Sequence, residues 1–295
     1  MPSRCPLHIV TGKGGVGKTT VALALAHRLA ATGARVVVAE VEGRGGLALA
    51  TGRPVGATPT ELAGRRLLGV QIDPRAALAG YLQRHYRMGF AAGLLQVEAL
   101  VDFATRIAPG LRDILLIGQV THLTETYPEV DVLVLDAPPA GRVGSFLGAG
   151  ESLAELTDGS PIAEQAASVM ADLRDPGCRT HVVSLLEELP VTEAMDTLRT
   201  LDELGLATGP VIANRCLDPV AVPDVPPPPP DGIDGDSWRS MTGALDAEST
   251  RQRAQSAWLA LLEYRTARPV VRLPELEPDT DAVTAARLAA HLELP

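Results

Sequence analysis

The stretch that decides the fold reads Gly12-Lys13-Gly14-Gly15-Val16-Gly17-Lys18-Thr19-Thr20. It follows a short apolar run, Leu7 to Thr11, and it opens a segment with helical periodicity, Lys18 to Ala31. A glycine-rich turn between a strand and a helix lets backbone N–H groups surround phosphates, and the start of the helix adds positive potential. The stretch therefore predicts a loop that binds the phosphates of a nucleotide.

The spacing of Gly12, Gly17, Lys18 and Thr19 predicts how this loop works. Lys18 should contact the β- and γ-phosphates, and the Thr19 hydroxyl should ligate Mg²⁺. The expected cofactors are therefore ATP or ADP with Mg²⁺. The alternative is a chance glycine-rich turn, which the strand before the loop and the helix after it disfavour.

Lysine is scarce in this chain, so its two lysines are informative. Of the 26 Lys and Arg residues, only Lys13 and Lys18 are lysines. A simple phosphate-binding loop does not need Lys13, and an accidental surface lysine is improbable in such a chain. We find no evident task for Lys13 within its own subunit and expect it to act in catalysis.

Length and composition predict a folded, acidic protein. The chain has 295 residues, of which 46 % are hydrophobic, and its net charge is −10. The charge disfavours nucleic-acid partners, which bind basic surfaces. Three scattered cysteines and six scattered histidines form no zinc, metalloid or catalytic spacing. No apolar run reaches the length of a transmembrane helix, so we expect a cytoplasmic protein.

Strands and helices alternate along the chain, which predicts an α/β fold with a doubly wound, mostly parallel sheet. We interpret residues 1–295 as one phosphate-binding-loop ATPase domain, with a helical subdomain at about 74–127 and 148–173 and a Pro-rich loop at about 217–246. Strands are predicted at residues 7–11, 35–41, 67–73, 130–136, 180–186, 210–214 and 269–273. Further helices are predicted at about 191–204, 248–266 and 280–293.

Two polar residues stand at the ends of predicted strands. Asp136 ends the apolar run Val130 to Leu135, where a second Mg²⁺ contact through water belongs. Asn214, the only asparagine of the chain, closes another strand. Its amide offers a donor and an acceptor, which suits the edge of adenine. Strand termination and turn formation are the alternative roles of these two residues.

The sequence resembles the arsenite-pump and tail-anchor-targeting ATPase family over nearly its whole length. The loop of residues 12–20 resembles the signature of the deviant P-loop class, and residues 136–147 are similar to the family's switch II. The resemblance implies an ATP-hydrolysing dimeric switch that couples its nucleotide state to a protein or membrane component. It also implies that Lys13 reaches the partner's phosphates. Adenine would be read by Asn214 and by the loop after the last strand, including Pro274 and Leu276.

Switch I departs from the family pattern. The family places an aspartate after the second strand to orient water, whereas ungapped alignment places Val41 there. Glu42 substitutes for it if the loop shifts by one residue; otherwise Glu40 and Glu42 only solvate the loop. Since a positioned carboxylate contributes about 10²–10⁴-fold in rate, hydrolysis is expected to be slow. The chain is then either a homodimer that uses Glu42 or a heterodimer with a related ATPase subunit. The alternative function is a weakly hydrolysing regulatory subunit paired with an active paralogue.

Overall fold

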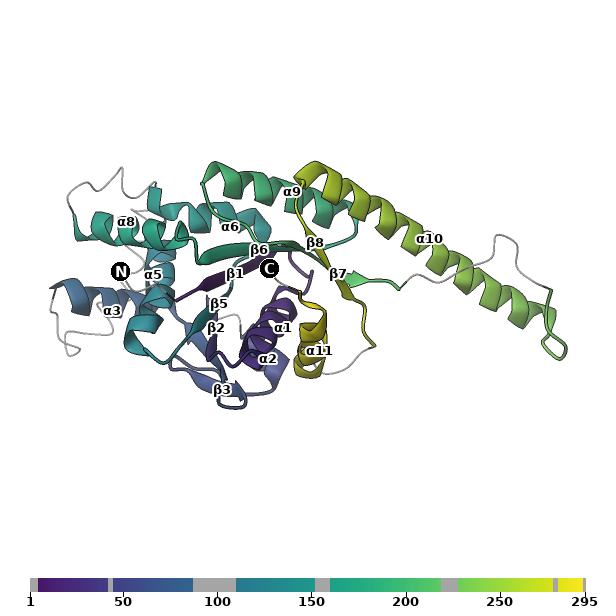
Figure 1. Ribbon diagram of the computed structural model, residues 1–295, viewed down its shortest axis with the longest axis horizontal. Helices are drawn as coiled ribbons and strands as arrows, with labels where there is room; N and C mark the ends of the chain where they lie inside the picture. Colours follow the sequence, from purple (N-terminus) through teal and green to yellow (C-terminus); the bar gives the residue numbers. More distant parts are fainter. Residues whose placement is uncertain are drawn as a thin grey trace.

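The computed structural model describes residues 5–41, 45–86, 110–151, 160–218, 228–277 and 281–293, with the backbone alone at 82–86. Its described strands form one eight-stranded sheet in the order β3-β4-β2-β5-β1-β6-β7-β8. Only the edge strand β3 runs antiparallel to its neighbour, so the α/β, mostly parallel fold is confirmed (Figure 1).

The strands are short and almost wholly buried in the centre of the sheet. Their bounds are β1 Leu7–Gly12, β2 Val36–Val41, β3 Thr60–Ala63, β4 Leu67–Ile72, β5 Val132–Asp136, β6 Cys178–Leu185, β7 Val211–Cys216 and β8 Val270–Pro274. The β2 residues are all buried, because helices cover both faces of a parallel sheet and every side chain meets a helix. This explains why continuous apolar runs, rather than alternating patterns, predicted these strands.

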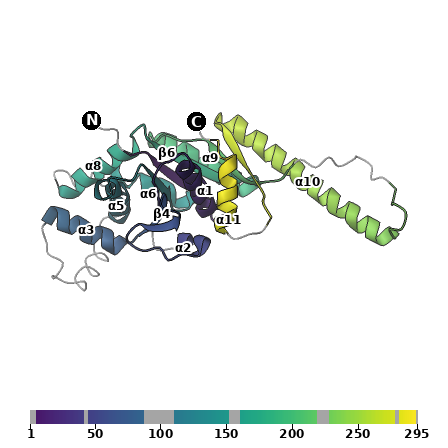
Figure 2. The ribbon, with the colours of Figure 1, turned by 60° about the horizontal axis from the view of Figure 1, so that its bottom comes forward.

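Helices cover the two faces of the sheet unequally (Figures 1 and 2). One face is covered by α1 Lys18–Ala31, α2 Gly46–Thr51 and α11 Asp281–Leu288, which is followed by a short 3-10 turn, Ala289–His291. The other face is covered by α3 Pro74–Tyr86, α5 Leu111–Thr126, α6 Ala140–Leu147, α8 Pro161–Leu173 and α9 Glu188–Glu203. None of the described helices is long and apolar enough to span a membrane.

Helix α10, Gly235–Thr266, corrects the sequence prediction at its start. Residues 235 to 246 were expected within the Pro-rich loop, but they form the first turns of this helix. Asp234 begins it as an N-cap, because its carboxylate accepts hydrogen bonds from the backbone of Asp236 and Ser237 at 3.0 and 2.9 Å. The Gly- and Asp-rich composition favoured a loop and hid this cap.

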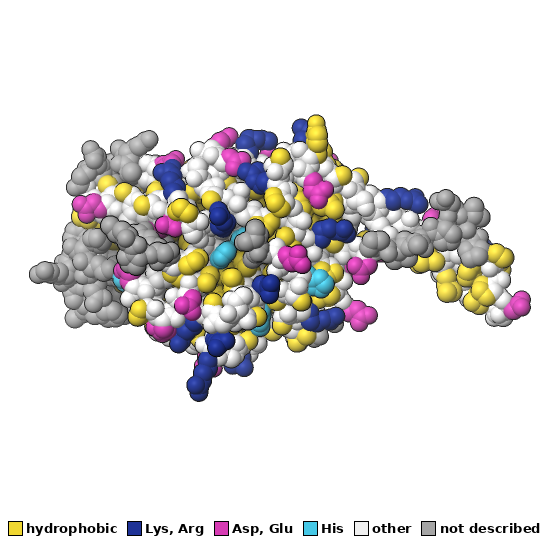
Figure 3. Space-filling model, viewed as in Figure 1, with side chains coloured by type: hydrophobic (Ala, Val, Ile, Leu, Met, Phe, Trp, Pro, Cys, Tyr) yellow, Lys and Arg dark blue, Asp and Glu magenta, His cyan; other side chains and the backbone are white. Residues whose placement is uncertain are grey.

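The two halves of α10 have different surroundings. Its second half packs against α9 and the end of β7, whereas its first half extends away from the body (Figure 1). Figure 3 shows hydrophobic side chains at the outer end of this extension, and the exposed fractions of Met241 and Leu245 are 53 % and 46 %.

Other differences concern short elements. The sequence did not predict β3, α2 or α6, each of at most eight residues, because such segments carry little periodicity. Residues 87–109, 152–159 and 219–227 of the expected helical subdomain and Pro-rich loop lie outside the described residues. The division into a sheet body and a helical subdomain therefore stays a prediction.

Two histidines on the neighbouring strands β1 and β6 form a partly buried pair. The Nδ1 of His8 lies 3.0 Å from the Nε2 of His181, and the two rings stack. Burial, which disfavours the charged imidazole, lowers the pKa of His8 and lowers the pKa of His181 to about 3. Both rings are thus neutral near pH 7.

Candidate functional site

The candidate site lies at the carboxyl ends of the central strands. The glycine-rich loop leaves β1 there, and Asp136 ends the neighbouring strand β5. Glu40 stands beside Asp136 in register on β2, and Asn214 stands near the end of β7. Parallel strands bring their carboxyl ends to one edge, which is the usual ligand site of open α/β sheets.

The loop between β1 and α1 has the geometry of a phosphate cradle. Gly15 and Gly17 have φ angles of 87° and 91°, in the left-handed region where a side chain is strained. A Cβ atom on Gly17 would lie 2.5 Å from the Nδ2 of Asn214, whereas one on Gly14 or Gly15 would meet no described atom within 4 Å. The crest of the loop is therefore open, with room for phosphates above it.

Lys18 is held across this loop. Its side chain is 8 % exposed, and its Nζ donates a hydrogen bond to the carbonyl oxygen of Lys13 at 3.0 Å. Lys18 is the first residue of α1, so its ammonium group and the positive end of the helix dipole would both act on a phosphate bound in the loop. The loop and the predicted lysine are thus arranged to bind the phosphates of a nucleotide.

Thr19 and Asp136 come together as the sequence predicts for a Mg²⁺ site. The Thr19 hydroxyl donates a hydrogen bond to the Oδ2 of Asp136 at 2.7 Å, and Asp136 is 1 % exposed. A hydroxyl and a buried carboxylate beside a phosphate cradle are the hard oxygen ligands that Mg²⁺ takes. These two residues fit the metal: Thr19 would ligate it directly, and Asp136 would hold it through water.

Glu40 has a structural task that the sequence did not reveal. Solvation of the switch I loop was one role that the sequence left open for Glu40, and its 1 % exposure does not fit that role. Its Oε1 accepts a hydrogen bond from the backbone N–H of Gly46 at 2.7 Å, and its Oε2 from that of Leu47 at 3.4 Å. A negative charge at the start of α2 suits the helix dipole. Glu40 therefore anchors α2 next to Thr19, while Glu42 lies outside the described residues.

Lys13 also has a partner within its own chain, contrary to expectation. Its Nζ forms an ion pair with the Oε1 of Glu193 on α9. The two side chains are 30 % and 38 % exposed, so this pair contributes at most about 1 kcal/mol to stability. The side chain of Lys13 thus leaves the loop toward α9, whereas that of Lys18 lies across it.

Asn214 joins β7 to the phosphate loop. Its Nδ2 donates a hydrogen bond to the carbonyl oxygen of Val16 at 2.9 Å, and the residue is 4 % exposed. Its Oδ1 is buried and finds no hydrogen-bond partner among the described residues. A buried acceptor without a partner is unfavourable, and the amino group of adenine is a donor of the kind that it lacks. The geometry thus supports the predicted role in base reading.

The loop after β8 lies beside Asn214 through the strand pairing. The backbone N–H of Glu275 donates a hydrogen bond to the carbonyl oxygen of Cys216 at 2.8 Å. Pro274 ends β8, and Leu276 packs on the core beneath α1 and α11. Pro274 and Leu276 are therefore next to the strand that carries Asn214, and their role in reading adenine stays a prediction. Thr20 lies in the first turn of α1, half-buried, with its role in nucleotide binding still a prediction.

The segment after Asp136 is tied to the phosphate loop and to α5. The Thr11 hydroxyl donates a hydrogen bond to the carbonyl oxygen of Pro138 at 2.8 Å. Arg142 on α6 forms an ion pair with Asp113 on α5 at 2.8 Å. These two contacts join the segment to β1 on one side and to α5 on the other.

We expect Asn214→Ala to relax the preference for ATP over GTP. An unpaired base-edge hydrogen bond costs about 1–3 kcal/mol, which corresponds to an affinity ratio changed by about 5- to 150-fold. Nucleotide titrations of both triphosphates measure the ratio. Asn214→Asp keeps a side-chain oxygen that can accept a hydrogen bond from adenine, but it loses the Nδ2 donor to the carbonyl oxygen of Val16. The variant therefore separates recognition of the base from support of the phosphate loop. Wild-type discrimination by Asn214→Ala would place adenine recognition elsewhere.

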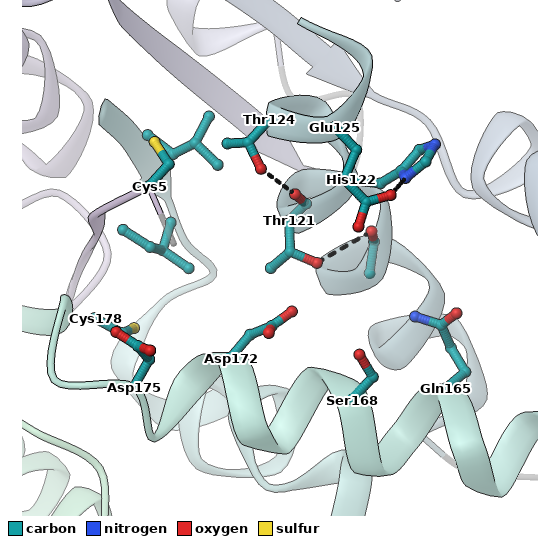
Figure 4. Close-up of a pocket in the computed structure, with 13 residues that line it drawn as sticks. Cys5, Thr121, His122, Thr124, Glu125, Gln165, Ser168, Asp172, Asp175 and Cys178 are labelled. Atoms are coloured by element: carbon teal, nitrogen blue, oxygen red, sulfur yellow. Dashed lines mark hydrogen bonds and ion pairs between the residues drawn. The ribbon is translucent and has the colours of Figure 1, made fainter. Parts of the chain in front are cut away.

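A second cavity lies at the opposite end of the sheet (Figure 4). Its volume is about 320 Å³, and its walls come from α5, α8 and the first residues of β1 and β6. Cys5 and Cys178 line it, and burial, reinforced by nearby aspartates, raises the pKa of these thiols to about 11 and about 12. Both are therefore neutral thiols near pH 7, far from the phosphate loop in the fold.

Comparison with known proteins agrees with this geometry. Residues 7–158 match the family model described as "Anion-transporting ATPase". The chain is 36 % identical to "ATPase BagA" of Mycobacterium tuberculosis, over 98 % of this chain and 86 % of that protein. It is 25 % identical to "ATPase asna-1" of Caenorhabditis elegans, over 71 % and 74 % of the two chains. It is 31 % identical to a "Putative arsenical pump-driving ATPase" of Chlorobaculum tepidum, over 48 % and 35 %. The chain therefore belongs to the anion-transporting ATPase family and is an ATPase.

Proposed function

We propose that this ATPase is a dimeric switch that couples its nucleotide state to a protein or membrane-component partner, in the cytoplasm. The observation that carries the proposal is that the side chains of the two lysines in the loop point in different directions. Lys18 lies across the phosphate cradle, whereas Lys13 turns outward to Glu193, half-exposed. One lysine serves the subunit's own phosphates, and the other remains available to a second nucleotide.

The residues of the site have distinct tasks in this proposal. The loop N–H groups and Lys18 bind the phosphates, and Lys18 exchanges the carbonyl oxygen of Lys13 for a phosphate oxygen. Mg²⁺, when bound, neutralises charge on the β- and γ-phosphates, and Thr19 and Asp136 would hold it. Asn214 and the loop with Pro274 and Leu276 orient the base. Water is oriented by a carboxylate of switch I.

Dimer formation would bring two phosphate loops face to face. The Lys13 ammonium then leaves the Glu193 carboxylate and binds the neighbour's phosphates. Breaking this ion pair costs little free energy because both side chains are partly exposed to solvent. A cation delivered to a transferring phosphoryl group stabilises the charge that develops there. Turnover would thus depend on assembly, which is the property of a switch.

A second candidate is a weakly hydrolysing regulatory subunit paired with an active paralogue. The observation that favours it is the commitment of Glu40 to the backbone of Gly46 and Leu47, which leaves this carboxylate engaged in holding α2. Glu42 is then the switch I carboxylate left to orient water. If Glu42 does not act, a related subunit must supply the missing group.

ATP turnover of the isolated chain, and of the chain mixed with related subunits from the same genome, tests these alternatives. For a homodimer, we expect turnover by the chain alone and a loss of about 10²–10⁴-fold in Glu42→Gln. Glu61→Gln, on the edge strand β3 and exposed, is the matched control and should keep full turnover.

Turnover that appears only after mixing would support the heterodimer with a regulatory chain. Sedimentation of the chain with Mg²⁺ and ATP measures assembly independently of hydrolysis. A monomer at every concentration, alone and with each related subunit, would overturn the dimeric switch.

A further inference from the structure

The strand that carries Asn214 is irregular immediately after this residue. Arg215 has a φ of 55°, in the left-handed region that residues other than glycine rarely adopt. The pairing of β7 with β8 shifts register between Ala213 and Cys216, which marks a bulge. Bulges redirect side chains and recur next to active sites. The conformation at Arg215 is unfavourable by itself, so neighbouring groups must hold it.

One side chain of α10 hydrogen-bonds the backbone on both sides of Cys216, where this bulge ends. The Nε2 of Gln255 donates a hydrogen bond to the carbonyl oxygen of Arg215 at 3.1 Å. The Oε1 of Gln255 accepts one from the backbone N–H of Leu217 at 2.9 Å. A single amide thus pairs with residues two apart, as a neighbouring β-strand would. On the other edge, the backbone of Glu275 pairs with Cys216 at 2.8 Å.

The same face of α10 fastens the helix to β7. Trp258 and Leu259, one turn after Gln255, pack against the cluster of Leu186, Ala213 and Cys216. Gln252, one turn before it, donates a hydrogen bond to the carbonyl oxygen of Asp218. Gln255 is therefore held on a packed helix face between two anchored turns, which makes its amide a rigid support rather than a mobile contact.

We propose that Gln255 is a positioning residue for base specificity. By holding Arg215 and Leu217, it fixes the bulge that directs the Asn214 amide toward the phosphate loop, with the Oδ1 of Asn214 left as the acceptor for the amino group of adenine. This inference rests on the proposed adenine-reading role of Asn214. It makes the second half of α10 a support of the base site that acts through the backbone after Asn214.

The experiment measures Kd values for ATP, GTP and inorganic tripolyphosphate, each with Mg²⁺, by calorimetry. Tripolyphosphate has no base, so it reports the phosphate loop alone. In Gln255→Leu we expect the ratio of ATP to GTP affinity to fall about tenfold, because two supporting hydrogen bonds are lost. Tripolyphosphate affinity should stay within about twofold of wild type. Ser256→Ala, next to Gln255, removes only a side-chain hydrogen bond within α10 to the carbonyl oxygen of Gln252; it is the matched control and should keep the wild-type ratio.

Gln255→Glu is the second variant, since it keeps the acceptor for Leu217 and loses only the donor to Arg215; we expect an intermediate ratio. An unchanged ratio in Gln255→Leu, in a wild-type protein that discriminates, would overturn this inference and leave the role of Asn214 intact. Equal losses of ATP and tripolyphosphate binding in both Gln255 variants would overturn it in favour of a merely structural role. A wild-type protein that does not distinguish ATP from GTP would overturn the adenine-reading proposal itself, and this inference with it.

Discussion

Lys18→Ala is expected to weaken Mg²⁺·ATP binding by about 100-fold and to stop turnover. The Lys18 ammonium is the one cation placed across the phosphate loop in the described structure, at hydrogen-bond distance from the loop backbone. A charge-assisted hydrogen bond contributes about 1.5–3 kcal/mol, and the upper value corresponds to roughly 100-fold in Kd. Calorimetric titration with ATP measures the loss.

Two controls accompany Lys18→Ala. Thermal unfolding without nucleotide shows whether the variant is folded, since Lys18 holds the loop through the carbonyl oxygen of Lys13. Arg28→Ala, on the last turn of the same helix, changes a charge away from the phosphates and should keep wild-type affinity. Unchanged ATP affinity in Lys18→Ala would contradict the assignment of the phosphate loop.

Lys13→Ala is expected to keep nucleotide affinity and to lose turnover by about 10²–10³-fold. Its side chain points to Glu193 rather than across its own loop, so its own nucleotide should bind almost normally. Loss of one preorganised donor to the transition state costs about 10²–10³ in kcat. ATP titration and steady-state turnover, measured on the assembly that turns over ATP, separate binding from catalysis.

Mixing variants tests whether Lys13 acts in the neighbouring subunit. In a homodimer, Lys18→Ala binds its own nucleotide weakly but still carries Lys13, and Lys13→Ala binds nucleotide but lacks that lysine. In the mixed dimer, the Lys18→Ala subunit should therefore supply Lys13 to the nucleotide of the Lys13→Ala subunit and restore turnover at that one site. Continued inactivity of a mixture that forms dimers would show that Lys13 acts within its own subunit. Glu193→Gln removes only the ion pair and should leave turnover at least at the wild-type level.

The sequence by itself determined the phosphate loop, the parallel sheet and most strand positions. These features are local: Gly12 to Thr19 carry their chemistry in consecutive residues, and the buried strands are continuous apolar runs. The pairing of Thr19 with Asp136 was also predictable, because both follow strands whose carboxyl ends meet at one edge of the sheet. Asn214 was singled out through its rarity, whereas its hydrogen bond to Val16 was not foreseen and its role in reading adenine stays a prediction.

Only the tertiary structure decided which residues support these groups. Glu40 accepts a hydrogen bond at the start of α2, Glu193 forms an ion pair with Lys13, and Gln255 donates a hydrogen bond to the backbone after Asn214. In the sequence, Glu40 and Glu193 look like ordinary acidic residues of a loop and a helix, and Gln255 looks like a polar residue on a helix surface. Glu193 and Lys13 are separated by 180 residues, and Gln255 and Arg215 by 40. Such contacts depend on how strands are ordered and helices packed, which no local pattern encodes. The residues that bind phosphate are consecutive in the chain, whereas the residues that support them come together only in the folded protein.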